Sequence, residues 1–213
     1  MDLFKILLWI HAFFGGSSLL FGLWVIVAKK GNAFHKKLGM AYYFCMVISA
    51  VVSLPMSVLH QNYFLFIIGI FTLFMLLSGK RYLQKKSAAD VNFIDWGLTA
   101  TMAVFGAAFV GYGLYLLTTS NSFGIVMVVF GSISFLFVWQ DYRNFTGKSR
   151  VRNFGLTTHL QRMMGSYIGT VTAFLVVNNT FLPSIVAWLL PTIVLVLLLI
   201  RWSKKYGVKA AVK

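Results

Sequence analysis

The chain has 213 residues, of which 59 % are apolar and only 11 % are charged, and its formal net charge is +15 at pH 7. Soluble domains carry about 25 % charged residues, so this composition excludes an ordinary water-soluble domain. An apolar chain with one cysteine is also neither an intrinsically disordered protein nor a disulfide scaffold. We therefore expect an integral membrane protein, with the lipid bilayer as its main partner and no nucleic-acid partner.

Four segments lack Asp, Glu, Lys and Arg altogether: 6–28, 38–79, 96–140 and 163–200. About 20 apolar residues form a helix that crosses the hydrocarbon core, so the first segment fits one crossing and the others fit two each. A polar break near the middle of each long segment indicates a turn. The sequence predicts an all-α polytopic membrane protein, a single domain over 1–213, with seven transmembrane helices at 5–28, 37–59, 62–83, 94–117, 122–142, 157–178 and 183–202.

Basic residues are grouped after the first, third, fifth and seventh predicted helices. The groups are Lys29, Lys30, Lys36 and Lys37; Lys80, Arg81, Lys85 and Lys86; Arg143, Lys148, Arg150, Arg152 and Arg162; and Arg201, Lys204, Lys205, Lys209 and Lys213. Seven crossings place all four groups on one side of the membrane. The positive-inside rule makes that side cytoplasmic, with the N-terminus outside and the C-terminus inside. Such a surface also suits anionic lipid headgroups.

The first predicted helix carries a face of small and polar residues. His11, Gly15, Ser18 and Gly22 follow one another at spacings that keep them on one side of a helix. Small residues let helices approach closely, so we expect this face to point into the bundle. A histidine within a membrane span is a functional candidate, and a hydrogen-bonded packing residue is the alternative. His60, in the turn after the second helix, is either solvated or shares an outer site with His11 and Ser18.

Acidic residues are scarce, and none of them is glutamate. The four are Asp2, Asp90, Asp95 and Asp141. Asp95 and Asp141 fall at the inner ends of the fourth and fifth predicted helices, where we expect helix capping and ion pairs with nearby basic residues. No pair of carboxylates falls inside a predicted span, which argues against a buried proton relay.

Two helices that leave the cytoplasmic side begin with similar segments. Residues 34–42 read FHKKLGMAY and residues 159–167 read HLQRMMGSY, so both contain a histidine, a basic residue, a glycine and a tyrosine in that order. A helix N-terminus carries partial positive charge and free N–H groups, which favour anions. The sequence predicts a ligand-binding site at the cytoplasmic side, and its residues are His35, Tyr42, His159, Arg162 and Tyr167. A solvated interfacial position is the alternative for each histidine.

Three short motifs together resemble a known family. They are His11-x3-Gly15, Lys30-Gly31-x3-His35-Lys36-Lys37-x-Gly39 and His159-x2-Arg162-Met163-Met164-Gly165-Ser166-Tyr167. The chain resembles bacterial multi-pass membrane proteins known as domain of unknown function 2306, and the resemblance covers most of the chain. It implies a multi-pass protein of the bacterial cytoplasmic (inner) membrane. It supplies candidate positions and no mechanism.

Three functions fit this sequence. The favoured one is binding of a small ligand or cofactor, such as a quinone, a lipid or an anion, without chemistry of its own. The second is a transmembrane electron carrier whose bis-histidine haems use His11, His35, His60 and His159 as axial ligands. The third is a small proton-linked transporter in which His11 titrates. No P-loop, GxGxxG or HExxH motif is present, and we predict no catalytic residue.

Overall fold

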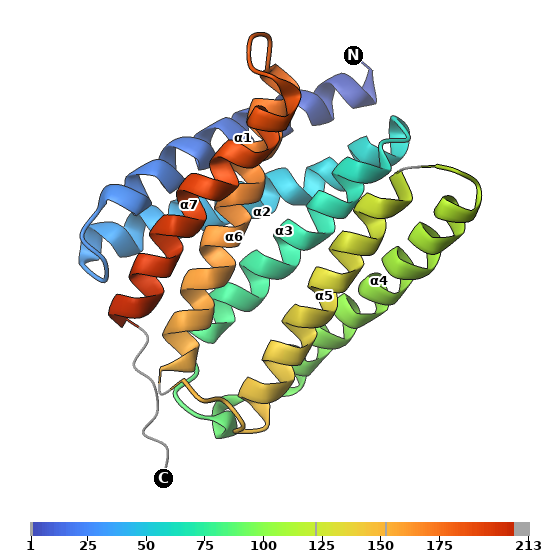
Figure 1. Cartoon of the computed structure of the whole chain (residues 1–213). Helices are drawn as coiled ribbons and strands as arrows, with labels where there is room; N and C mark the ends of the chain where they lie inside the picture. The colour runs from blue at the N-terminus through green and yellow to red at the C-terminus, as the bar shows by residue number, and fades with distance from the viewer. Residues whose placement is uncertain (1, 122, 152, 207–213) are drawn as a thin grey trace. The chain divides into compact units, whose positions relative to one another are not determined.

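The computed structural model describes residues 2–121, 123–151 and 153–206; of the basic residues named above, Arg152, Lys209 and Lys213 lie outside these ranges. Within them the chain is all-α, with seven long helices and one short 3-10 helix, η1 (Figure 1). The elements are α1 (Leu3–Val27), α2 (Ala33–Leu59), α3 (Tyr63–Tyr82), η1 (Ala88–Asp90), α4 (Phe93–Thr118), α5 (Phe123–Phe145), α6 (Phe154–Asn178) and α7 (Ser184–Tyr206). Each of the seven predicted segments is helical, and the helix ends agree with the predicted ends to within a few residues.

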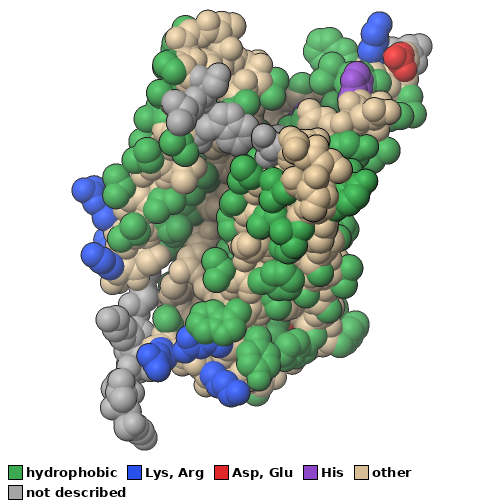
Figure 2. Space-filling model, turned by 45° about the vertical axis from the view of Figure 1, so that its right-hand side comes forward, with side chains coloured by type: hydrophobic (Ala, Val, Ile, Leu, Met, Phe, Trp, Pro, Cys, Tyr) green, Lys and Arg blue, Asp and Glu red, His purple; other side chains and the backbone are tan. Residues whose placement is uncertain are grey.

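Five helices among the described residues are long and apolar enough to cross a membrane, namely α1 to α5. Only 11 % of the most apolar part of α1 is buried, and large side chains such as Trp9 and Phe13 are about 70 % exposed. Hydrophobic side chains predominate on the face drawn in Figure 2. An apolar exterior of this kind is stable in lipid and unfavourable in water. These helices therefore support a multi-pass membrane protein.

Asparagine side chains define where two of the helices begin. The side chain of Asn32 accepts a hydrogen bond from the backbone N–H of His35 at 2.7 Å, which caps α2. At α4, Asn92 accepts from the N–H of Asp95, and the carboxylate of Asp95 accepts from the N–H of Asn92. These caps satisfy N–H groups that the first helical turn leaves without partners, so each helix start is fixed by local sequence.

The chain divides into two compact units, and the divisions fall within α3, α6 and α7. Unit 1 comprises residues 1–76 and 160–202, and unit 2 comprises residues 77–159 and 203–213. In unit 1, α1 and α2 pack side by side. Its core contains Tyr42, Met46, Leu76 and Tyr167. The ring of Tyr167 lies directly over Gly22, where any added Cβ would overlap it, so this glycine permits α6 to approach α1.

Unit 2 is built on the hairpin of α4 and α5, which lie side by side in Figure 1. Glycines on both helices let the two backbones come close. A Cβ added at Gly113 would lie 2.8 Å from the carbonyl oxygen of Gly124, and one added at Gly131 would lie 2.8 Å from that of Gly106. Close backbone approach of this kind is typical of helix pairs in membranes. A second core, of Tyr82, Phe145 and Phe154, lies at one end of the same unit.

Candidate functional site

A buried arginine lies on an inward face of α6 in unit 1. The side chain of Arg162 is among the most completely buried in the described chain, at 1 % exposure. Its guanidinium carbon lies 4.7 Å from the ring centre of Phe74, which is a cation–π distance. Ser166 and Thr170 follow at four-residue spacing, so all three polar side chains share one face of the helix. This face places a fixed positive charge inside a largely apolar unit.

Two tyrosines named by the sequence motifs meet next to this face. The hydroxyl of Tyr42 is hydrogen-bonded to Oγ of Ser166 at 2.7 Å, and both side chains are buried. The rings of Tyr42 and Tyr167 make an edge-to-face contact with centroids 6.0 Å apart. Tyr167 donates its hydroxyl proton to the carbonyl oxygen of Leu19 at 3.1 Å. Tyr42 and Tyr167 are thus together, while Ser166, which our site prediction omitted, connects them to the face of Arg162.

Polar contacts continue from this point along unit 1. Thr170 and Ser18 each donate a hydroxyl proton to the sulfur of Met46, at 3.3 and 3.2 Å. Further along α1, Nδ1 of His11 lies 3.0 Å from both the hydroxyl and the carbonyl oxygen of Ser49. Ser18 is fully buried, and His11 is half-buried. The small polar face of α1 therefore points inward, as its spacing indicated, and His11 has partners on α2.

The other two histidines of unit 1 lie at opposite ends of α2. His35 is half-buried in the first turn. His60 is exposed at the C-cap, with its ring centre 3.8 Å from that of Phe4. The two are separated by about 37 Å at 1.5 Å per helical residue, so they cannot ligate one iron atom. Phe4 is roughly 10 Å along α1 from His11, so His11 and His60 have separate neighbours.

The fifth residue of the predicted site, His159, belongs to unit 2. Its Nδ1 lies 2.8 Å from the carbonyl oxygen of Gly79 near the end of α3. Tyr42, Arg162, Tyr167 and His35 belong to unit 1. No cluster of three or more His, Cys, Asp or Glu side chains that could hold a metal ion occurs within residues 2–121, 123–151 and 153–206. The haem hypothesis stays a prediction.

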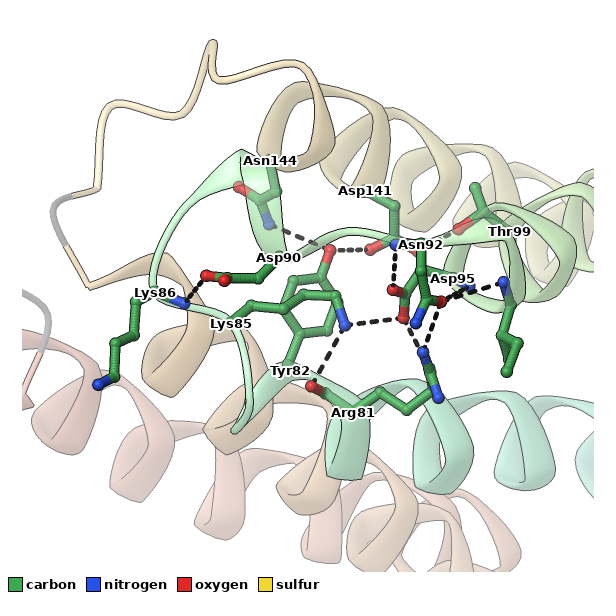
Figure 3. A network of polar contacts seen from close by, with 11 residues as sticks. Arg81, Tyr82, Lys85, Lys86, Asp90, Asn92, Asp95, Thr99, Asp141 and Asn144 are labelled. Atoms are coloured by element: carbon green, nitrogen blue, oxygen red, sulfur yellow. Dashed lines mark hydrogen bonds and ion pairs between the residues drawn. The ribbon is translucent and has the colours of Figure 1, made fainter.

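Unit 2 contains a carboxylate that is more deeply buried than the sequence analysis predicted. Asp141 on α5 is fully buried and accepts hydrogen bonds from the hydroxyl of Tyr82 at 2.6 Å and from that of Thr99 at 3.0 Å (Figure 3). The amide of Asn144 donates to the same tyrosine hydroxyl at 3.3 Å and to Thr158 at 3.2 Å. We expected Asp141 at the membrane interface. Asp141 follows Met127 and Ser134, both buried, at seven-residue spacing, which keeps the three on one face of α5, and that spacing was the available signal.

An ion-pair cluster lies beside this carboxylate. Oδ1 of Asp95 is 2.6 Å from Nε of Arg81 and 2.7 Å from Nζ of Lys85. The side chains of Asp95 and Lys85 are almost fully buried, whereas Arg81 remains partly exposed. The predicted role of Asp95, capping combined with ion pairing to basic residues, is confirmed. In Figure 3 this cluster joins the end of α3 to the start of α4, which gives it a structural role.

Unit 1 therefore offers a buried cation beside two tyrosines, and unit 2 offers a hydrogen-bonded carboxylate beside a buried ion pair. The first group combines donors of the kind that recognise an anion. In the second group, the carboxylates of Asp141 and Asp95 are paired with donors from the same unit. Comparison of the chain with family models, with curated proteins and with solved structures finds no match.

Proposed function

We propose that this chain is a multi-pass membrane protein that binds a small anionic or carbonyl-bearing ligand in unit 1, with Arg162 as the charge that recognises it. Tyr42 and Tyr167 flank the ligand. The observation that carries the proposal is the guanidinium of Arg162, held at 1 % exposure on the face of α6 that also bears Ser166. Charged side chains inside membrane-embedded helices are costly, and they mark ligand or ion sites by default.

The chemistry of the side chains supports this ligand class. A guanidinium presents five N–H donors in a planar fork, which matches the two oxygens of a carboxylate or phosphate. The ring of Phe74 stabilises the guanidinium by a cation–π contact, with 4.7 Å between the guanidinium carbon and the ring centre. Tyr42 and Ser166 add hydroxyl groups one helical turn away. A quinone carbonyl, a lipid phosphate or a small carboxylate would each find donors of the right kind here.

The proposal includes a membrane topology and a location. All seven helices span the bilayer, with the N-terminus outside and the C-terminus in the cytoplasm. The grouping of basic residues between alternate helices supports this orientation. The proposed location is the bacterial inner membrane, and it rests only on the resemblance of three short sequence motifs described above. In this topology His35 lies towards the cytoplasmic side of unit 1 and is a candidate ligand contact. His159 belongs to unit 2, and its role as a ligand contact stays a prediction from the sequence.

A binding measurement on a matched pair of arginine variants tests the proposal. The probes are a short-chain ubiquinone and a short-chain carboxylate, hexanoate, titrated into purified protein by calorimetry. We expect Arg162→Gln to weaken binding of at least one probe by about tenfold or more, which is about 1.4 kcal/mol. Lys5→Gln removes the same charge from an exposed position of unit 1, in the first turn of α1, and should leave the affinity unchanged. Parallel His35→Ala and His159→Ala variants test the two histidines.

Two results would overturn the proposal. One is wild-type protein that binds neither probe, and the other is a folded Arg162→Gln variant with wild-type affinity. If Arg162→Gln fails to fold, Tyr42→Phe replaces it, since this change keeps the ring and removes only the hydroxyl that meets Ser166. Unchanged affinity in Tyr42→Phe would then count against the proposed position of the ligand.

A further inference from the structure

A second binding surface lies where α1 turns into α2, and it is independent of the Arg162 site. Lys30 organises this corner. Its ammonium group donates to the carbonyl oxygens of Val25 at 2.8 Å and Ile26 at 2.6 Å, and it lies 4.0 Å from the ring centre of Trp202 on α7. A cation is favoured at the C-terminal end of a helix because the last carbonyls there lack helical partners. Burial lowers the pKa of Lys30.

Other cations at this corner face outward. Lys29, Lys36 and Lys37 are all exposed, and Arg201, next to Trp202, is exposed as well. Lys30 ties the end of α7 to this corner through Trp202, so Arg201 belongs to the same surface. We call these four residues the basic corner. Lys29 follows the end of α1, Lys36 and Lys37 lie near the start of α2, and Arg201 lies on α7. All four side chains are exposed and can contact a partner outside the chain.

Unit 1 contains no carboxylate that could neutralise the basic corner. Its single acidic residue is Asp2, which caps the opposite end of α1. A helix of 25 residues is about 37 Å long, several times the distance over which exposed charges interact at physiological salt. No carboxylate of unit 1 therefore competes with an external anion for the basic corner.

Exposed aromatic side chains adjoin the cations. Trp24 is 57 % exposed in the last turn of α1, and Phe34 is 56 % exposed in the first turn of α2. Aromatic rings beside lysines are typical of the membrane–water boundary, where the rings contact acyl chains and the ammonium groups contact phosphates. A soluble anion would contact only the ammonium groups and would leave the aromatic rings exposed to water. A phospholipid would contact the ammonium groups with its phosphate and the rings with its acyl chains.

We propose that the basic corner is a binding site for an anionic phospholipid. The headgroup phosphate lies among Lys29, Lys36 and Lys37, and the acyl chains extend along Trp24 and Phe34. Such a site goes beyond the general attraction of a basic protein surface to an anionic leaflet, because Lys30 and Trp202 fix the backbone that carries these particular side chains.

Native mass spectrometry of the protein in an uncharged detergent tests this site. Bound lipid is counted after addition of phosphatidylglycerol, of phosphatidylcholine or of inorganic phosphate. We expect retention of phosphatidylglycerol and not of phosphatidylcholine. The triple variant Lys29→Gln, Lys36→Gln, Lys37→Gln should lose about tenfold or more in affinity. The control triple variant Lys86→Gln, Lys148→Gln, Arg150→Gln removes equal charge from unit 2 and should retain the lipid.

Any one of three outcomes of this experiment would overturn the proposal. Equal loss in both triple variants would mean that overall charge alone attracts lipid. Equal retention of phosphatidylcholine would remove the role of the cations. Thermal stabilisation by inorganic phosphate equal to that by phosphatidylglycerol would indicate an anion site without a lipid.

The substituted lysines are exposed, so the lipid-free variant should unfold at the wild-type temperature. The triple variant Lys29→Gln, Lys36→Gln, Lys37→Gln should still bind the short-chain ubiquinone with wild-type affinity, which separates this test from that of the proposed function.

Discussion

The buried carboxylates of this chain lie next to hydrogen-bond donors or cations, which offset the free-energy cost of removing the carboxylates from water. Asp141 is compensated by two hydroxyls, and Asp95 by two cations and a backbone N–H. Removing one partner of a buried ion pair leaves the other charge uncompensated, which typically costs 3–5 kcal/mol. Asp95 and Lys85 therefore depend on each other, while the partly exposed Arg81 contributes less. The same reasoning explains why Asp95 could be predicted: it lies three residues after a capping asparagine and near several basic residues.

Asp90 gives a prediction for the dependence of stability on pH. Its carboxylate accepts hydrogen bonds from the backbone N–H groups of Ser87 and Lys86, both at 2.8 Å, and these bonds lower the pKa of Asp90. The unfolded chain, with an ordinary pKa near 3.9, then binds more protons than the folded chain below that pH. The contribution to stability is complete above the unfolded pKa and is lost as the pH falls through the folded pKa.

Unfolding of the wild type and of Asp90→Asn, followed in detergent across a pH series, measures this contribution. We expect the wild type to be more stable above roughly pH 5, and the difference to shrink towards zero as the pH falls below about 3.9. A difference that stays constant down to low pH would show that the carboxylate charge is not its source.

At the scale of the helix, small residues determine which faces pair. The hairpin of α4 and α5 depends on glycines that leave no room for a side chain, whereas Gly97 and Gly111 on α4 face open space. Glycine normally weakens a helix relative to alanine, so its presence at a contact reflects close packing. This distinction between contact glycines and open glycines depends on the partner helix and is absent from the α4 sequence taken alone.

Substitution of one glycine of each kind tests this difference. A Cβ at Gly131 would lie 2.6 Å from Cγ2 of Val110 and 2.8 Å from the carbonyl oxygen of Gly106. The backbone oxygen cannot rotate away, so we expect Gly131→Ala to destabilise unit 2 by about 1–3 kcal/mol. Gly111→Ala should leave stability unchanged or raise it by about 0.5–1 kcal/mol. Denaturant unfolding in detergent compares the two, and similar effects of both variants would contradict the packing of the hairpin.

At the scale of the whole chain, the proposed topology makes a labelling prediction. In a Cys45→Ala background, single cysteines are introduced by Ser120→Cys, Thr180→Cys and Lys86→Cys, all at exposed positions. A membrane-impermeant maleimide should label the first two in intact cells and the third only after permeabilisation. The seven-span arrangement places loops after even-numbered helices outside and loops after odd-numbered helices inside.

The position after α6 distinguishes the seven-span arrangement from one in which only α1 to α5 cross. Labelling at Thr180→Cys from the outside requires α6 to cross. Protection of that cysteine in intact cells, together with labelling at Ser120→Cys, would show that α6 does not cross. The reverse pattern at Ser120→Cys and Lys86→Cys would show the opposite orientation.

Runs of apolar residues determined the seven helices by themselves, because the length of an uncharged run and the polar break within it are local properties. Capping residues such as Asn32 and Asn92 determined two helix starts for the same reason. Only the tertiary structure decided which polar groups meet. Tyr42 and Ser166 are 124 positions apart, and Tyr82 and Asp141 are 59 apart. Helical periodicity gives the face on which a residue lies, whereas the residue opposite it depends on how side chains from separate helices pack together.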